Sequence, residues 1–425
     1  MKVGFTGPFG DANFGDYAML VNNIYDMDEK NIIVFSYNKE LMQLLNNGYL
    51  KTYNIEECIV DIDYNYIPTL GNNYSVEYDD TVEIPVEIIS RCINLEEVKR
   101  KISEIDILIV NGGGYFNNLW NAKHRKKKLY SILVPIIIAS ELNKKIVFAG
   151  NTYGPFESSD KFYFSFFNSL RNVEYYSRDD VYSMAWLRQI GVHNELKLIP
   201  DDLYFVNEKI LKKCDNDYGD YIILELYSSM NEIEIHLKEI KKFVEQIYNC
   251  YGYKTLLLPL DRNYGGEYQS NFIKENIPEI IYVDFEESEY RPIEQINSLV
   301  SNAKFVVCQR YHMFVFSMAN KTPAIHILKD VCGDKRYYFT KTYGLLTQVF
   351  KNQSIQENLF MKTDLKEALN EIVENFHEII DYQKLLFNDK MRLNEEQMRK
   401  ARKKFFDCIK LNVNNDYLSS NDVAK

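Results

Sequence analysis

The sequence lacks the short motifs that assign a chain directly to a common enzyme class. It has no P-loop, no Gly-x-Ser-x-Gly, no His-Glu-x-x-His and no Gly-x-Gly-x-x-Gly motif, so NAD binding is not expected. Its seven cysteines are scattered without a Cys-x-x-Cys pair, which argues against a zinc site or a disulfide framework and is typical of a reducing compartment. No signal peptide is visible, and the longest apolar run, residues 130–140, is too short to span a bilayer. We therefore expect a cytoplasmic protein.

Negative charge exceeds positive charge overall. The 425 residues carry a formal net charge of −11, which argues against binding nucleic acid through a basic field but permits a local basic pocket for a small anion. The basic run at residues 123–128 is typical of a solvated helix start. Its alternative role is contact with an anionic acceptor or with the inner face of a membrane.

Short apolar strands alternate with helical stretches in both halves of the chain, a pattern typical of buried parallel sheets. The sequence predicts an α/β protein with two Rossmann-like domains facing across a cleft (GT-B-like) and C-terminal helices. The first domain covers residues 1–207, with an irregular insertion at about 55–95, and the second covers 218–350. Amphipathic helices follow at 364–411, and a disordered tail is expected at 412–425.

Polar turns follow several predicted strands, where ligands bind in open α/β sheets. In the second domain, Gln309-Arg310-Tyr311-His312 follows an apolar strand and precedes an apolar helix. The planar guanidinium of Arg310 suits a carboxylate or a phosphate, and His312 can transfer protons near neutral pH. The alternative is a structural salt bridge by Arg310 and a helix cap by His312.

Two polar turns of the first domain also follow predicted strands. Ser177-Arg178-Asp179-Asp180 pairs an arginine with a predicted helix cap. Three consecutive glycines, Gly112–Gly114, permit close approach of the backbone to a ligand, or form only a tight turn.

The stretch GDANFGDYAML, residues 10–20, follows the first predicted strand. Asn13 and Asp16 are good turn and N-cap residues, and a glycine such as Gly15 at a strand-to-helix turn permits anion binding. By itself the stretch favours a helix cap. If the Asp16 carboxylate points away from its helix, we expect it to bind an acceptor hydroxyl.

These motifs, in this order, resemble the polysaccharide pyruvyl transferase family over about residues 4–327. The matching pieces are Asn13-Phe14-Gly15-Asp16, Gly112–Gly114, Tyr153-Gly154-Pro155, Ser177-Arg178-Asp179 with Ser183 and Leu187, Pro200-Asp201, and Arg310-Tyr311-His312 with Pro323. The resemblance implies a transferase that moves the pyruvyl group of phosphoenolpyruvate onto a sugar of a cell-surface polysaccharide or its lipid-linked precursor. The product is a ketal, and phosphate is released.

The resemblance also implies roles for the matching residues. Arg310, Arg178 and Tyr311 would bind the donor phosphoenolpyruvate, with His312 as the acid and Asp16 as a base or acceptor ligand. The acceptor-binding residues would be Asn13, Gly15, Gly113 and Gly114. The scheme needs phosphoenolpyruvate as co-substrate but no metal and no other cofactor. Peripheral membrane contact and a homo-oligomer are compatible with it.

The sequence departs from the family pattern at positions close to these motifs. Tyr311 stands where a leucine is common, and the first strand of the second domain carries Glu225 where many members have an arginine. Two alternatives therefore stay open: a GT-B glycosyltransferase that uses a nucleotide sugar, and a non-catalytic glycan-assembly protein. Residues 286–289 carry the nearest carboxylates for a nucleotide ribose.

Overall fold

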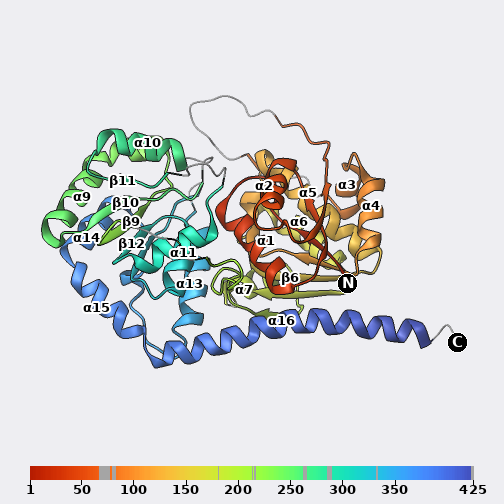
Figure 1. The fold of residues 1–425 in the computed structure, drawn as a ribbon. Helices are drawn as coiled ribbons and strands as arrows, with labels where there is room; N and C mark the ends of the chain where they lie inside the picture. Colours follow the sequence, from red (N-terminus) through yellow and green to blue (C-terminus); the bar gives the residue numbers. More distant parts are fainter. Residues whose placement is uncertain are drawn as a thin grey trace. The chain divides into compact units, whose positions relative to one another are not determined.

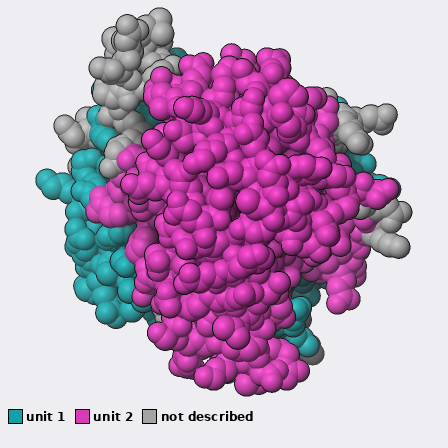
Figure 2. All heavy atoms as spheres, turned by 90° about the vertical axis from the view of Figure 1, so that its left-hand side faces the viewer, with its two compact units in different colours: residues 1–11, 19–202, 398–425 teal, residues 12–18, 203–397 magenta. Residues whose placement is uncertain are grey.

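The computed structural model of the chain contains two compact units, each built around a parallel sheet (Figures 1 and 2). Unit 1 comprises residues 1–11, 19–202 and 398–425, and unit 2 comprises residues 12–18 and 203–397. The structure describes residues 1–66, 77–78, 83–179, 181–212, 214, 217–261, 266–284, 290–331 and 334–422. Residue 180 and residues 286–289, both considered above, lie outside this set, as does part of the predicted insertion.

Unit 1 has a sheet in the order β3-β2-β1-β4-β6-β7-β8, with β5 paired to β6, and all described pairings are parallel. The strands are β1 (Lys2–Thr6), β2 (Asn31–Ser36), β3 (Asn54–Ile59), β4 (Ile107–Val110), β5 (Gly113–Phe116), β6 (Lys145–Tyr153), β7 (Val173–Ser177) and β8 (Leu196–Leu198). Every residue of β4 is buried, as expected for a strand covered on both faces.

The helices of unit 1 connect these parallel strands. They are α2 (Lys39–Asn47), α3 (Pro85–Ser90), α4 (Leu95–Glu104), α5 (Lys123–Glu141), α6 (Asp160–Ser169) and α7 (Tyr182–Gln189), with short 3-10 helices at Asn118–Asn121 and Glu157–Ser159. Helix α1 (Phe14–Met27) begins in unit 2 and continues in unit 1. Apolar side chains of α3 to α7 share one core with the sheet.

Unit 2 has a six-stranded parallel sheet in the order β11-β10-β9-β12-β13-β14. Its strands are β9 (Tyr221–Glu225), β10 (Lys254–Leu257), β11 (Ile281–Tyr282), β12 (Val306–Cys308), β13 (Ala324–Ile327) and β14 (Met361–Lys362). Its helices are α8 (Met230–Ile235), α9 (Leu237–Tyr251), α10 (Gly266–Asn276), α11 (Ile293–Asn302), α12 (Tyr311–Ala319), α13 (Arg336–Val349), α14 (Leu365–Glu374) and α15 (Phe376–Leu386), with a 3-10 helix at Glu357–Leu359.

The strand order determines where a ligand is expected in each sheet. In chain order, the six strands of unit 2 run 3-2-1-4-5-6, the doubly wound Rossmann order. The order reverses between the first and fourth strands, which are β9 and β12. Ligands of such sheets bind beside the carboxyl ends of these two strands. Glu225 ends β9, and residues 309–312 follow β12 directly.

The C-terminal helix α16 (Asp389–Asp422) extends further than the sequence predicts. Residues 412–422, expected to be a disordered tail, continue this helix (Figure 1). An existing helix extends at little cost through residues that include neither proline nor glycine, which is the physical reason for the difference. No helix in the described part of the chain is both long and apolar enough to cross a membrane.

Arg402 anchors the later part of α16 within unit 1. Its guanidinium donates to Asp202 Oδ1 at 2.9 Å, to Asp26 Oδ2 at 2.7 Å and to Asn23 Oδ1 at 3.0 Å. All but Asp26 are fully or nearly fully buried, so this ion-pair network is largely shielded from water. The part of α16 from Met398 onward therefore belongs to unit 1, whereas residues 389–397 belong to unit 2.

Candidate functional site

The strand-to-helix turn at residues 309–312 lies at the switch point of unit 2 and is organised by Glu225. The side-chain oxygen Oε2 of Glu225 accepts hydrogen bonds from the backbone N–H groups of Gln309, at 3.1 Å, and Arg310, at 2.8 Å. The carboxylate at the end of β9 thus binds the backbone at the end of the neighbouring strand β12. This contact fixes where α12 begins.

The Arg310 side chain lies between two buried carboxylates. Its Nη2 forms an ion pair with Asp261, and its Nε is 3.5 Å from Glu225 Oε1. The guanidinium carbon is also 3.7 Å from the centroid of the Tyr227 ring. Arg310 is only 8% exposed, and its Nε has no hydrogen-bond partner among the described residues. A donor in such a position suits an anionic ligand.

Burial raises the pKa of Glu225 to about 7, and the positive charge of Arg310 opposes that rise. A carboxyl group with this pKa changes protonation state around neutral pH. Perturbed groups of this kind are frequent in functional sites, although structural ion pairs also produce them.

Two lysines bring further positive charge to the same region of unit 2. The Nζ of Lys329 is 3.5 Å from the centroid of the Tyr227 ring that Arg310 also contacts. The Nζ of Lys341 is 4.4 Å from the Tyr338 ring and 5.6 Å from the ring of Tyr311. Arg310 and Lys329 thus contact Tyr227, and Lys341 lies beside Tyr311 and Tyr338. We call Arg310, Lys329 and Lys341 the cationic cluster.

His312, in the first turn of α12, packs against the start of helix α1. A Cβ atom on Gly15 would lie 1.9 Å from His312 Nδ1, so only glycine leaves room for the imidazole there. The same turn of α1 contacts the arginine network, because the Phe14 N–H donates to Asp261 Oδ1 at 3.1 Å. Gly15 and His312 are thus in contact within unit 2, and their roles in acceptor binding and acid catalysis stay predictions.

Asn13 is the residue that caps helix α1. Its side-chain oxygen accepts a hydrogen bond from Gly15 N–H at 3.2 Å, the usual N-cap contact. Asp16 lies inside the first helical turn, half-buried, where its negative charge is favourable near the helix N-terminus. The cap predicted for this stretch is therefore provided by Asn13, one turn earlier than Asp16.

His326 on β13 supports the 309–312 turn from inside unit 2. Its Nε2 lies 3.1 Å from the carbonyl oxygen of Gln309 and its Nδ1 lies 2.8 Å from Thr342 Oγ1. Burial lowers its pKa to about 3, so the ring is neutral at physiological pH. A neutral ring can donate only one N–H, and the acceptor carbonyl of Gln309 assigns that proton to Nε2.

The predicted first-domain residues lie in unit 1. Arg178 is fully buried, forms an ion pair with Asp201 at 2.5 Å and donates to Thr152 Oγ1 at 2.9 Å. Asp179 accepts hydrogen bonds from the N–H groups of Tyr182 and Ser183, at 3.2 and 2.8 Å, and so satisfies the first N–H groups of α7, although the N-cap position itself is Val181. The donor-binding role of Arg178 stays a prediction.

The glycine triplet also lies in unit 1. A Cβ on Gly112 would come within 2.2 Å of the buried Asp202 carboxylate, and Gly113 has a φ of 155° that favours glycine. Gly113 and Gly114 begin strand β5. Packing thus requires glycine at Gly112, and the role of Gly113 and Gly114 in acceptor binding stays a prediction.

The basic run that opens α5 is paired with carboxylates of unit 1. Lys123 lies 3.3 Å from Glu77, Lys128 lies 2.6 Å from Asp11, and Lys127 lies 3.8 Å from Asp61. These pairs offset the cost of placing cations at a helix N-terminus. They support the structural interpretation of the run over a docking surface.

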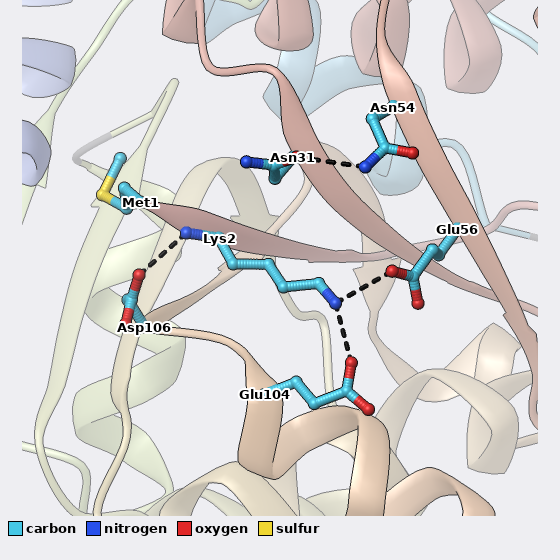
Figure 3. Close-up of a pocket in the computed structure, with 7 residues that line it drawn as sticks. All are labelled: Met1, Lys2, Asn31, Asn54, Glu56, Glu104 and Asp106. Carbon is cyan, nitrogen blue, oxygen red and sulfur yellow. Dashed lines mark hydrogen bonds and ion pairs between the residues drawn. The ribbon is translucent and has the colours of Figure 1, made fainter.

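A surface pocket of about 320 Å³ lies beside the amino ends of several strands of the unit 1 sheet (Figure 3). Its lining residues come mainly from the amino ends of β1, β2 and β3, whereas ligands of such sheets bind at the carboxyl ends. Lys2 Nζ contacts Glu56 and Glu104 at 2.9 and 2.7 Å, so its charge is already neutralised. In the described part of the chain, no group of three or more potential ligands could hold a metal ion.

Sequence reasoning missed Asp261, Lys329 and Lys341. Asp261 and Lys329 both follow predicted strands, and this placement was the available signal for them. Lys341 lies within α13, so no strand-end pattern marks it. The cationic cluster and the tyrosines that it contacts have no fixed spacing along the chain, so no sequence motif identifies them.

Solved structures define the class of this fold. HepE from Anabaena, solved in complex with UDP, matches with a TM-score of 0.55 and 11% identity over 96% of this chain and 100% of its own. S. aureus MnaA, also solved with UDP, matches with a TM-score of 0.54 and 12% identity over 90% of each chain. The glycosyltransferase SnogD from Streptomyces nogalater matches with a TM-score of 0.53 and 9% identity over 97% of this chain and 99% of its own. The chain thus has the GT-B fold of two parallel-sheet α/β domains.

A family model narrows this class. The model of the polysaccharide pyruvyl transferase family matches residues 13–329, and the chain belongs to that family. The matched region begins at the cap of α1 and ends at Lys329, so it includes the 309–312 turn with every contact described for Arg310 and His312. No curated protein sequence matched the chain.

Proposed function

We propose that the protein transfers the pyruvyl group of phosphoenolpyruvate to two hydroxyls of one sugar, forming a ketal and releasing phosphate. The observation that carries the proposal is the cationic cluster beside His312 at the switch point of unit 2. Phosphoenolpyruvate carries a carboxylate and a phosphate, which planar guanidinium and ammonium groups bind well.

The chemistry assigns a task to each part of the site. His312 as imidazolium gives a proton to the methylene carbon of the enol, which leaves a positively charged centre at the neighbouring carbon. A sugar hydroxyl forms a bond to that carbon and loses its proton to the imidazole. The second hydroxyl then displaces phosphate, which carries away the remaining proton. Arg310 and Lys329 would hold the phosphate while Tyr311 and Lys341 border the donor.

The test is release of phosphate from phosphoenolpyruvate in the presence of nitrophenyl sugars or lipid-linked sugars. We expect release by the wild-type protein and a loss of at least about 100-fold in Arg310→Ala and His312→Ala, as for removal of a charge-stabilising or acid–base group. Arg392→Ala and His193→Ala, at exposed positions, are the matched controls and should keep full activity. No release with any acceptor, together with no thermal stabilisation by phosphoenolpyruvate, would refute the proposal.

A second candidate function is transfer of a sugar from a nucleotide donor. The observation that favours it is the bound UDP in two structures that share this fold, HepE and MnaA. Stabilisation by UDP, GDP or CMP, with indifference to phosphoenolpyruvate, would support this function. If Arg310→Ala and His312→Ala both leave the biological phenotype intact, the protein acts as a non-catalytic glycan-assembly protein instead.

A further inference from the structure

The Glu225 carboxylate has two oxygens in different situations. Oε2 accepts the two backbone N–H groups of the 309–312 turn, whereas Oε1 is buried and has no hydrogen-bond partner within the described ranges. The nearest cation to Oε1 is Arg310, whose Nε lies 3.5 Å away and also lacks a hydrogen-bond partner. The structure therefore holds an acceptor and a donor near each other without a hydrogen bond between them.

The local charge is unfavourable for binding an anion while both carboxylates are ionised. One guanidinium, that of Arg310, faces Asp261 and Glu225, so the buried group carries a net charge of −1. The groups that act on Glu225 are the Cys308 thiol on β12, Arg310 directly after β12, and Asp261 after β10. Protonation of Glu225 would bring the charge to zero and leave Nε of Arg310 available to a ligand.

We propose that Glu225 balances the charge of the anion site, so that binding of a phosphate or carboxylate group to Arg310 is coupled to uptake of one proton by Glu225. The proton comes from solvent and adds to Oε1, and no other bond changes. This inference rests on the proposed function in that Arg310 is the anion-binding group.

The test is calorimetric titration with sulfate, whose charge is constant between pH 6 and pH 8, at fixed ionic strength. If only the protein with protonated Glu225 binds, the apparent affinity falls about tenfold from pH 6 to pH 8, because the competent fraction falls by that factor. Titration at pH 8 in two buffers of different ionisation enthalpy should show uptake of about one proton. Histidines titrate in this range, so the readout is the difference between the wild type and Glu225→Gln at each pH.

Glu225→Gln removes the charge and retains an oxygen for the backbone N–H groups. We expect it to bind sulfate about tenfold more tightly than the wild type at pH 8 and equally at pH 6. Glu378→Gln, at an exposed position of α15, should behave as the wild type. If Glu225→Gln does not fold, proton uptake by the wild type decides the question.

The outcomes separate this inference from the proposed function. Sulfate binding that is equal at pH 6 and pH 8 without proton uptake overturns the inference, as does an unchanged pH dependence in Glu225→Gln. Turnover of phosphoenolpyruvate together with uncoupled binding overturns the inference alone. Coupled sulfate binding with no turnover of phosphoenolpyruvate and no thermal stabilisation by it supports the inference and refutes the pyruvyl transfer. A protein that binds neither sulfate nor phosphoenolpyruvate at pH 6 overturns both.

Discussion

Replacing Gly15 by alanine tests whether the start of α1 positions His312. The added Cβ would lie 1.9 Å from Nδ1 and 2.2 Å from Cε1 of the imidazole, whereas such contacts are hardly ever shorter than 3.0 Å. The ring or the helix must therefore move by about 1 Å. A displacement of that size at a reacting group costs about 100-fold in rate, or ~2.7 kcal/mol in activation free energy. We expect Gly15→Ala to lower phosphate release by this factor.

The effect on stability separates this mechanism from a general defect. In the wild type, overpacking against His312 should lower the free energy of unfolding by about 1–3 kcal/mol. In a His312→Ala background the imidazole is absent, and alanine should instead stabilise α1 by up to about 1 kcal/mol, since Gly15 is helical and its φ is not positive. Urea unfolding of the four proteins measures this cycle. An equal effect of Gly15→Ala in both backgrounds would refute the reasoning.

Three further predictions concern the buried charges. Asp261→Asn should lower the free energy of unfolding by about 1.5–3 kcal/mol in urea titrations, because Arg310 loses one charged partner but stays paired with Glu225; a change under 1 kcal/mol would contradict the pairing. Arg402→Ala should cost about 3–5 kcal/mol, with the exposed Arg392→Ala near zero as its control. The pKa of Glu225 rises from 4.5 to about 7 on folding, so stability should fall by about 3 kcal/mol as pH rises from 4.5 through 7. Glu225→Gln should remove that slope, and a slope that persists in this variant would assign it to other groups.

The sequence predicts the fold class well because each parallel strand is a continuous apolar run. Strands β4 and β12 are fully buried, and both are recognisable without structural information. The family is also recognisable, since its motifs lie in the turns after these strands. The sequence does not predict the helical end of α16. Its residues are mostly polar, and extension of a helix depends on the turns that precede it.

The candidate site could be predicted only where its residues are close in the chain. Arg310 and His312 share one turn, so one pattern identifies both. Asp261 and Phe14 are 247 positions apart in the chain. Their hydrogen bond follows from the packing of the start of α1 within unit 2, which no local sequence pattern encodes. Gly15 was selected as a turn glycine, whereas the structure requires it for the space that His312 occupies.

The carboxylate of Glu225 at the end of β9 determines what the rest of the site must provide. An arginine at the end of β9 would add a positive charge, whereas Glu225 adds a carboxylate beside Arg310. Phosphoenolpyruvate is multiply charged, so the difference must be compensated by other cations or by a proton. Lys329 shares the Tyr227 ring with Arg310 and is near enough to contribute a charge. Lys329→Ala and the double variant Lys329→Ala with Glu225→Gln separate these two possibilities. If both variants lose donor binding, the lysine provides the compensating charge, and the proton on Glu225 does not.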